Sequence, residues 1–337
     1  MRRLERASFV AGLLLLAWFV HRIGPERVGQ NLGEMGWGFL LVFALQVLPI
    51  FFGALSWRLV LDDTGAPTLP ALARMLVAGE AVNAVSPVAL VGGELVRISL
   101  LSRRIPPEDA VPSVALAAMA QCCAQILFVL SGLPFAVTLV RSGPLRTGFA
   151  ALSAALAAVL AGLLFLAISR GAHDWIARRI ARSARLRRLS MRVPPAWRDA
   201  IPRSLRALRA HPGRFGLSVG ASLLVWQMGA VETLLILRFL RVPVGLARAY
   251  AIEVLAVTIE GALFFVPAKM GTQEGGKILI FLAAGLDPAK GLALGLVRRI
   301  RELAWAGVGL GLLGGAGHRR SAASPTEGLT AQSARLT

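Results

Sequence analysis

The chain has 337 residues, of which 56% are hydrophobic and 16% are charged, and its formal net charge is +19. Soluble globular domains are about 45–50% apolar, so this composition excludes an ordinary soluble enzyme or binding domain. Several runs exceed the ~18 apolar residues that mark a transmembrane helix. The sequence therefore predicts an integral membrane protein of roughly six to ten helical segments, with no room for a large soluble domain.

The N-terminus, MRRLERASFVAGLLLLAWFV, joins a basic stretch to an apolar run. Signal peptides and first membrane helices share this pattern, and the lack of a small-x-small cleavage site before Arg22 favours a retained helix at 7–23. Further apolar segments lie near 35–61, 71–92, 109–139, 145–168, 215–240, 247–267 and 289–315, with weaker stretches at 94–105 and 274–286.

Residues 170–214 contain thirteen arginines against only two aspartates. This excess is typical of a cytoplasmic loop that follows the positive-inside rule, and it would also suit a patch for anionic lipid headgroups. No interleaved aromatics or nucleic-acid motif accompany the arginines, so we expect no nucleic-acid partner. We place this loop and both termini in the cytoplasm of a multi-pass protein of the bacterial inner membrane. Counting the spans from the N-terminus and from the basic loop then places both ends of 64–108 on the cytoplasmic side. The same count places both ends of 248–286 on the external side.

Two parts of the chain match at an offset of 180 residues, with the shared pattern E-x6-P-x6-E-x2-[RK]. This alignment pairs Arg58 with Arg238, Glu80 with Glu260, Pro87 with Pro267, Glu94 with Glu274, and Arg97 with Lys277. Such coincidence among scarce residue types indicates an internal duplication. The span count gives the two copies opposite orientation, as in many secondary transporters.

The predicted fold is therefore an all-α integral membrane protein, a polytopic helical bundle with two inverted repeats. Each repeat is expected to hold one broken, re-entrant element. The breaks are expected at Pro87, Gly92, Gly93, Pro267, Gly275 and Gly276, because proline interrupts the helical ladder and glycine permits tight turns. The expected divisions are a first membrane helix and external loop (1–34), a first repeat (35–169), the basic cytoplasmic loop (170–214), a second repeat (215–316) and a disordered cytoplasmic tail (317–337).

Ionisable residues inside a bilayer cost roughly 2.5–3.5 kcal/mol each on insertion scales, so each needs a partner or a wet site. The expected substrate-binding set is Glu80, Asn83, Glu94, Arg97, Glu260, Lys269, Gln273, Glu274, Lys277, Arg298, Arg301 and Glu302. The pairs Glu94–Arg97 and Glu274–Lys277 have the spacing of neighbours on one helical face. The alternative is that these charges only form structural ion pairs that seal two bent hairpins.

The last span carries Arg298, Arg301 and Glu302 on one face, about 15 Å from its start, while Arg299 points elsewhere. An arginine fork suits a headgroup phosphate or carboxylate, and neutralisation of the re-entrant glutamates is the alternative. Glu232 and Glu253 are weaker candidates.

Motifs for catalysis are missing. No G-x-S-x-G, phosphate-binding glycine loop or metal-ligand cluster occurs. The adjacent Cys122 and Cys123 cannot form an ordinary disulfide. We expect no catalytic residue, no metal and no cofactor.

The stretches NAVSPVALVGGELVR and FFVPAKMGTQEGGKILIFLAAGLDPAKGLALGLVRRIRE resemble the two signatures of the lysylphosphatidylglycerol synthase transmembrane family, also called flippase-like. The resemblance extends from about residue 5 to 315, and its late motif is closest to members associated with hopanoid biosynthesis. In the best-known members this region is joined to a cytosolic aminoacyl-transferase domain and moves aminoacylated phosphatidylglycerol across the bilayer.

The resemblance implies that Asn83, Glu94, Arg97, Glu274 and Arg298 are among the polar positions of a translocation cavity. Met119 and Gln121 stand opposite Arg299 and Arg301, so the cavity is expected to be asymmetric. The residues after the last span leave no room for a synthetase domain, and we expect the chain not to be an enzyme.

The resulting hypothesis is an inner-membrane lipid translocase that moves a polar or anionic headgroup through an intramembrane polar cavity. The alternative is a non-transporting scaffold for enzymes that modify hopanoids or phospholipids. The expected partners are a membrane lipid, anionic lipid headgroups at the basic loop and, for the alternative, lipid-biosynthetic enzymes.

Overall fold

Helices make up almost all of the residues that the structure, a computed structural model, describes: 21, 25–61, 65–85, 92–139, 143–168, 203–204, 206–262 and 271–321. Their order is α2 (Pro25–Met35), α3 (Gly38–Leu45), α4 (Val47–Leu59), α5 (Leu69–Val85), α6 (Gly92–Leu101), α7 (Pro107–Leu139), α8 (Gly143–Ile168), α12 (Pro212–Phe239), α13 (Leu246–Ala262), α14 (Thr272–Ala283) and α15 (Pro288–Ser321). These ranges contain no strand, which confirms the all-α class.

Within the described ranges, three helical stretches are long and apolar enough to cross a membrane: Gly38–Leu59, Pro107–Ala136 and Pro212–Phe239. The first of these combines α3 and α4, which meet at Gln46. The chain is a membrane protein. The predicted first helix at 7–23 and most of the basic loop at 170–214 lie outside the described residues.

The helices begin and end close to the predicted segments, with two differences. The external loop expected before residue 35 is largely the helix α2, and α15 continues to Ser321 rather than ending at 316. The start of α15 follows from local chemistry, because Pro288 stands at the first helical position and the Asp287 carboxylate accepts a hydrogen bond from the Ala289 amide at 2.9 Å.

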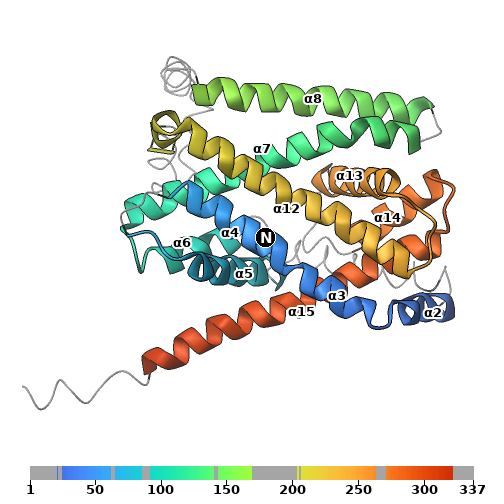
Figure 1. The fold of residues 1–337 in the computed structure, drawn as a ribbon, viewed down its shortest axis with the longest axis horizontal. Coiled ribbons are helices and arrows are strands. Elements are labelled where there is room, and N and C mark those ends of the chain that lie inside the picture. The colour runs from blue at the N-terminus through green and yellow to red at the C-terminus, as the bar shows by residue number, and fades with distance from the viewer. Residues whose placement is uncertain are drawn as a thin grey trace, which may run out of the picture.

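Helices α4 and α12 lie side by side and antiparallel (Figure 1). Near one end, the Ser56 hydroxyl is 2.8 Å from the hydroxyls of both Ser218 and Ser222. Near the other, α3 begins with Gly38 against the Phe239 ring, at the end of α12. Arg214 donates to the Leu59 carbonyl at 3.1 Å, which satisfies an acceptor at the end of α4. The first-half segment 35–61 and the second-half segment 215–240 therefore run in opposite directions.

The longest helix of each half packs against the other half. Helix α15 lies against α5, and α7 lies against α13 (Figure 1). Both contacts depend on a glycine: a Cβ on Gly309 would lie 2.5 Å from the Val77 carbonyl oxygen, and one on Gly132 would lie 2.7 Å from the Tyr250 ring. The main apolar core, with Phe128, Ile236 and Phe281 fully buried, lies around α13, which contacts α7, α12 and α14.

Gly271 gives a testable backbone prediction. It precedes α14 with a φ of +73°, a left-handed conformation that costs L-residues about 1–2 kcal/mol, with asparagine tolerated best. We expect Gly271→Ala to lower the free energy of unfolding by about 1–2 kcal/mol and Gly271→Asn to lower it less, measured by denaturation of the purified protein. The control is Gly245→Ala, where no atom lies within 4 Å of an added Cβ and φ is not positive. Equal stability of Gly271→Ala and the control would contradict this role.

Candidate polar site inside the helical bundle

Arg298 of α15 is held by α12 and α13. Its two terminal nitrogens contact the two carboxylate oxygens of Glu253 at 2.9 and 2.7 Å, a bidentate pair. It also donates to the Gly229 carbonyl and to the Thr233 hydroxyl, each at 2.8 Å. Thr233 in turn donates to Glu253 at 2.6 Å. Arg298 and Glu253 are almost fully buried, at 6% and 5% exposed, so these contacts replace water for both charges.

Arg301 lies one turn further along α15 and joins it to α12 and to the junction of α3 with α4. Its Nη1 donates to Glu232 at 2.7 Å and to the Gln46 side-chain oxygen at 2.6 Å. Glu232 is 5% exposed and lies 3.7 Å from Arg298 as well. The spacing of three places both arginines on one helical face, as predicted.

These charges lie well inside the helices. Arg298 is ten residues from the start of α15, which corresponds to about 15 Å. Glu253 is seven residues from the start of α13, and Glu232 is seven residues from the end of α12, which corresponds to about 11 Å for each. The contacts of Arg298 with both carboxylates place all three side chains at one level of the bundle.

A pocket of about 180 Å³ adjoins the two ion pairs. Its polar lining consists of Gln46, Gln121, Glu232, Glu253, Arg298 and Arg301, and its apolar lining includes Val42, Pro49 and Trp226. The lining thus combines charged and amide side chains with apolar ones, which suits a polar occupant that also has apolar parts. Glu232 Oε1, Arg298 Nε and Arg301 Nε are enclosed by the protein and have no hydrogen-bond partner in its described part.

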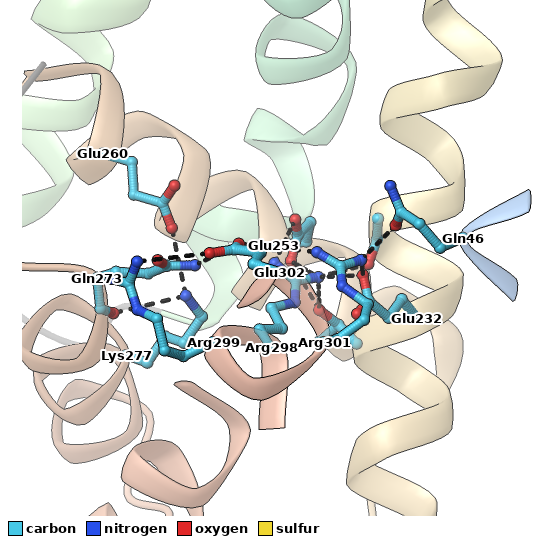
Figure 2. A network of polar contacts seen from close by, with 12 residues as sticks. Gln46, Glu232, Glu253, Glu260, Gln273, Lys277, Arg298, Arg299, Arg301 and Glu302 are labelled. Atoms are coloured by element: carbon cyan, nitrogen blue, oxygen red, sulfur yellow. Dashed lines mark hydrogen bonds and ion pairs between the residues drawn. The ribbon is translucent and has the colours of Figure 1, made fainter. Parts of the chain in front are cut away.

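A second branch of the network extends from α15 to α14 (Figure 2). Arg299 donates through Nε to Glu274 at 3.2 Å and lies 3.6 Å from Glu302, which also accepts from Gln273 at 3.2 Å. Glu274 is fully buried and accepts from the Gly271 amide at 3.0 Å. Arg299 therefore takes part in the network, whereas the sequence indicated that it points away from it.

Lys277 is 1% exposed and donates to Glu260 of α13 at 3.2 Å. The predicted neighbour pair Glu274–Lys277 is thus divided between two partners, Arg299 and Glu260. In Figure 2 the labelled side chains form a continuous row across the bundle, from Glu260 and Lys277 through Glu302 and Arg298 to Gln46.

The polar residues of the first half form a separate cluster between α5 and α6. Arg97 forms an ion pair with Glu80 and lies 3.7 Å from Glu94. The Asn83 side chain accepts from the Gly93 amide at 2.7 Å, at the start of α6. Glu80 is 61% exposed, so this cluster is more open than the Arg298 network.

The structure thus brings together seven of the predicted site residues, namely Glu260, Gln273, Glu274, Lys277, Arg298, Arg301 and Glu302. Glu80, Asn83, Glu94 and Arg97 meet in the first-half cluster. Lys269, Pro87 and Pro267 lie outside the described residues.

The predicted glycine breaks differ in their outcome. Gly92 opens α6 and Gly93 is buried in its first turn. Gly275 and Gly276 lie inside α14, so they are not the break; the left-handed residue is Gly271, just before the helix. Gly276 instead allows close packing, since an added Cβ would lie 3.2 Å from Ile259 of α13.

Glu232 and Glu253 are only weaker candidates in the sequence, yet they are the main carboxylate partners of Arg301 and Arg298. Gln46, Thr233 and Arg299 are not among the predicted site residues. The signal that was available is charge balance, because buried arginines require buried carboxylates nearby. In the part of the chain that the structure describes, no group of histidine, cysteine and acidic residues is arranged to hold a metal ion.

The sequence model of the family described as "Lysylphosphatidylglycerol synthase TM region" matches residues 7–311. No match was found among curated proteins or among solved structures. The match covers both signature stretches and every helix from α2 to α14. The association with hopanoid biosynthesis stays a prediction. The chain therefore belongs to the family of lysylphosphatidylglycerol synthase transmembrane regions, and its function is related to membrane lipids.

Proposed function

We propose that the protein is a lipid translocase of the inner membrane, in which a polar headgroup passes through the pocket beside Arg298 and Arg301. The observation that carries this proposal is a network of buried ion pairs beside a pocket of about 180 Å³, deep within the bundle. Ionisable groups at such depth are costly and mark substrate or ion pathways in membrane proteins. The family's connection to a lipid synthase supports a lipid as the cargo.

We further propose that the two halves are inverted repeats around this site. Arg97 pairs with Glu80 and Lys277 pairs with Glu260, each across 17 residues and at positions that match at the offset of 180. Helices α5, α6 and α7 correspond in order to α13, α14 and α15, and α4 is antiparallel to α12. Two opposed halves that meet at the site would support alternating access.

The re-entrant elements are proposed to be the pairs α5–α6 and α13–α14. Close contacts within each pair support this: a Cβ on Gly79 would lie 2.9 Å from the Gly93 carbonyl oxygen, and Gly276 lies close to Ile259. The connecting stretches that contain Pro87 and Pro267 lie outside the described residues.

Both termini and the basic loop are proposed to face the cytoplasm, where the arginines would also attract anionic headgroups. Two arginines at the described end of the loop support its position. Arg203 donates to the Glu108 carbonyl at 3.2 Å, and Arg214 donates to the Leu61 carbonyl at 2.6 Å, which places this end beside the start of α7 and the end of α4. The proposed translocase does not change its lipid chemically, so we propose no catalytic role.

Neutralising one ion pair of the pocket tests the translocase proposal. The double variant Glu232→Gln, Arg301→Gln removes both charges together, so no uncompensated charge remains. We expect the translocation rate to fall at least about tenfold, which corresponds to about 1.4 kcal/mol of activation free energy. The measurement uses proteoliposomes with phospholipid and glycolipid probes labelled on one acyl chain, to which an impermeant quencher is added.

The control is the double variant Glu34→Gln, Lys290→Gln. It removes a pair of 2.5 Å that also involves α15 but connects it to α2 instead of lining the pocket. Equal rates for the two double variants would contradict the proposal. If neither double variant changes the translocation rate and deletion of the basic loop abolishes function, the scaffold alternative replaces the translocase proposal.

A further inference from the structure

The two arginines of the pocket are already neutralised. Arg298 is bidentate to Glu253, and Arg301 contacts Glu232. The pocket lining described above therefore contains two positive and two negative side chains. A sequence with clustered arginines suggested an anion site, but in this geometry the guanidinium groups have carboxylates in the place of an anionic ligand.

An anionic group would add a third negative charge beside two positive ones. The balanced lining offers no net positive charge to offset the desolvation of that anion, which is costly in a site of low dielectric constant. An added cation would meet the same difficulty. The ion pairs therefore disfavour a ligand with net charge at the point of contact.

The charged lining offers hydrogen-bonding groups of both kinds. Glu232 and Glu253 are acceptors, whereas Arg298 and Arg301 are donors. A hydroxyl group donates one hydrogen bond and accepts others, and it is small enough to enter between ion pairs. The amides of Gln46 and Gln121 add uncharged donors and acceptors to the same wall, and Trp226 adds apolar ring surface for C–H groups.

The size of the pocket limits what enters it. Sites for drug-sized ligands measure about 300–1,000 Å³. A volume of about 180 Å³ therefore accommodates only the tip of a headgroup, with the acyl chains left in the bilayer.

We infer that this pocket binds the uncharged, hydroxyl-bearing tip of a lipid headgroup, such as a glyceryl, polyol or sugar group, rather than a phosphate. The inference rests on the proposed function and names the chemistry of its cargo. Hydroxyls of this kind occur on uncharged glycolipids and at the end of phosphatidylglycerol, so the experiment separates these two sources.

The test measures equilibrium binding to the full chain, purified in detergent. The protein is offered a mixture of glucosyl diacylglycerol, phosphatidylglycerol, phosphatidic acid and diacylglycerol with identical acyl chains, and the retained lipids are quantified by native mass spectrometry. We expect glucosyl diacylglycerol to be retained about tenfold over phosphatidic acid and diacylglycerol, the ratio that about 1.4 kcal/mol provides. Retention of phosphatidylglycerol to the same degree would show that a phospholipid also supplies the hydroxyls; its loss would assign them to the glycolipid.

Three variants test whether the preference comes from the pocket. Gln121→Leu removes an amide from the wall without touching an ion pair and should lower retention of the glucosyl lipid about tenfold. Gln125→Leu, one turn away on α7 and not part of the lining, should leave it unchanged. Glu232→Gln removes the main carboxylate partner of Arg301, so it should shift retention toward phosphatidic acid.

Preferential retention of phosphatidic acid by the wild type would overturn the inference. Equal effects of Gln121→Leu and Gln125→Leu on retention of the glucosyl lipid would also overturn it. The binding assay does not depend on transport, so the two proposals can fail separately. Preferential binding of glucosyl diacylglycerol by a protein that translocates no lipid would refute the proposed function alone. Translocation by a protein that prefers phosphatidic acid would refute only this inference.

Discussion

Replacement of Arg298 by methionine is expected to lower the free energy of unfolding by about 3–5 kcal/mol, because it leaves a buried carboxylate without its partner. Glu253 loses both of its contacts to the guanidinium group, at 2.9 and 2.7 Å, and keeps the hydrogen bond from the Thr233 hydroxyl. Arg298→Met should also abolish translocation. The stability is measured by denaturation of the reconstituted protein, alongside the transport assay described above.

The double variant Arg298→Met, Glu253→Met separates stability from function. Replacing both members of a buried ion pair by apolar residues of similar volume is often neutral, so we expect most of the lost stability to return. Translocation should stay absent, because the polar wall is gone. If Arg298→Met alone is as stable as the wild type, Glu253 does not depend on Arg298. If the double variant transports lipid, the ion pair has no part in the pathway.

Gly309→Ala is expected to destabilise the protein by about 1–3 kcal/mol, the usual range for overpacking a close contact. An added Cβ would lie 2.5 Å from both the Val77 carbonyl oxygen and the Ala81 Cβ, and backbone on α5 cannot yield as a flexible side chain does. Because α5 also carries Glu80 and Asn83, a shift of α15 away from it would disturb the first-half cluster and slow transport as well.

The same helix provides matched controls. Gly307 and Gly311 have no atom within 4 Å of an added Cβ. Alanine is the better helix former by about 1 kcal/mol, so Gly307→Ala and Gly311→Ala should leave stability unchanged or raise it. The three variants are compared by thermal denaturation in one detergent. A uniform response of all three would show that helix propensity, and not contact with α5, decides the effect.

The sequence by itself determined the helical segments of this protein. Long apolar runs give the spans, and Gly92 gives the start of α6, whereas α14 begins after Gly271 and not at the predicted Gly275 and Gly276. It also determined that Arg298 and Arg301 share a face, since that follows from helical periodicity alone. Their depth within the bundle followed from their distance from the start of the last helix.

Only the tertiary structure decided which partners these charges have. Glu253 is 45 residues from Arg298 in sequence, and Glu232 is 69 residues from Arg301. A buried charge indicates that a compensating group exists, but helix crossing and rotation select that group. The same holds for Gln46, whose contact with Arg301 spans 255 residues. The neutral balance of the pocket thus arises from packing between α12, α13 and α15, because separate helices become neighbours only in the folded bundle.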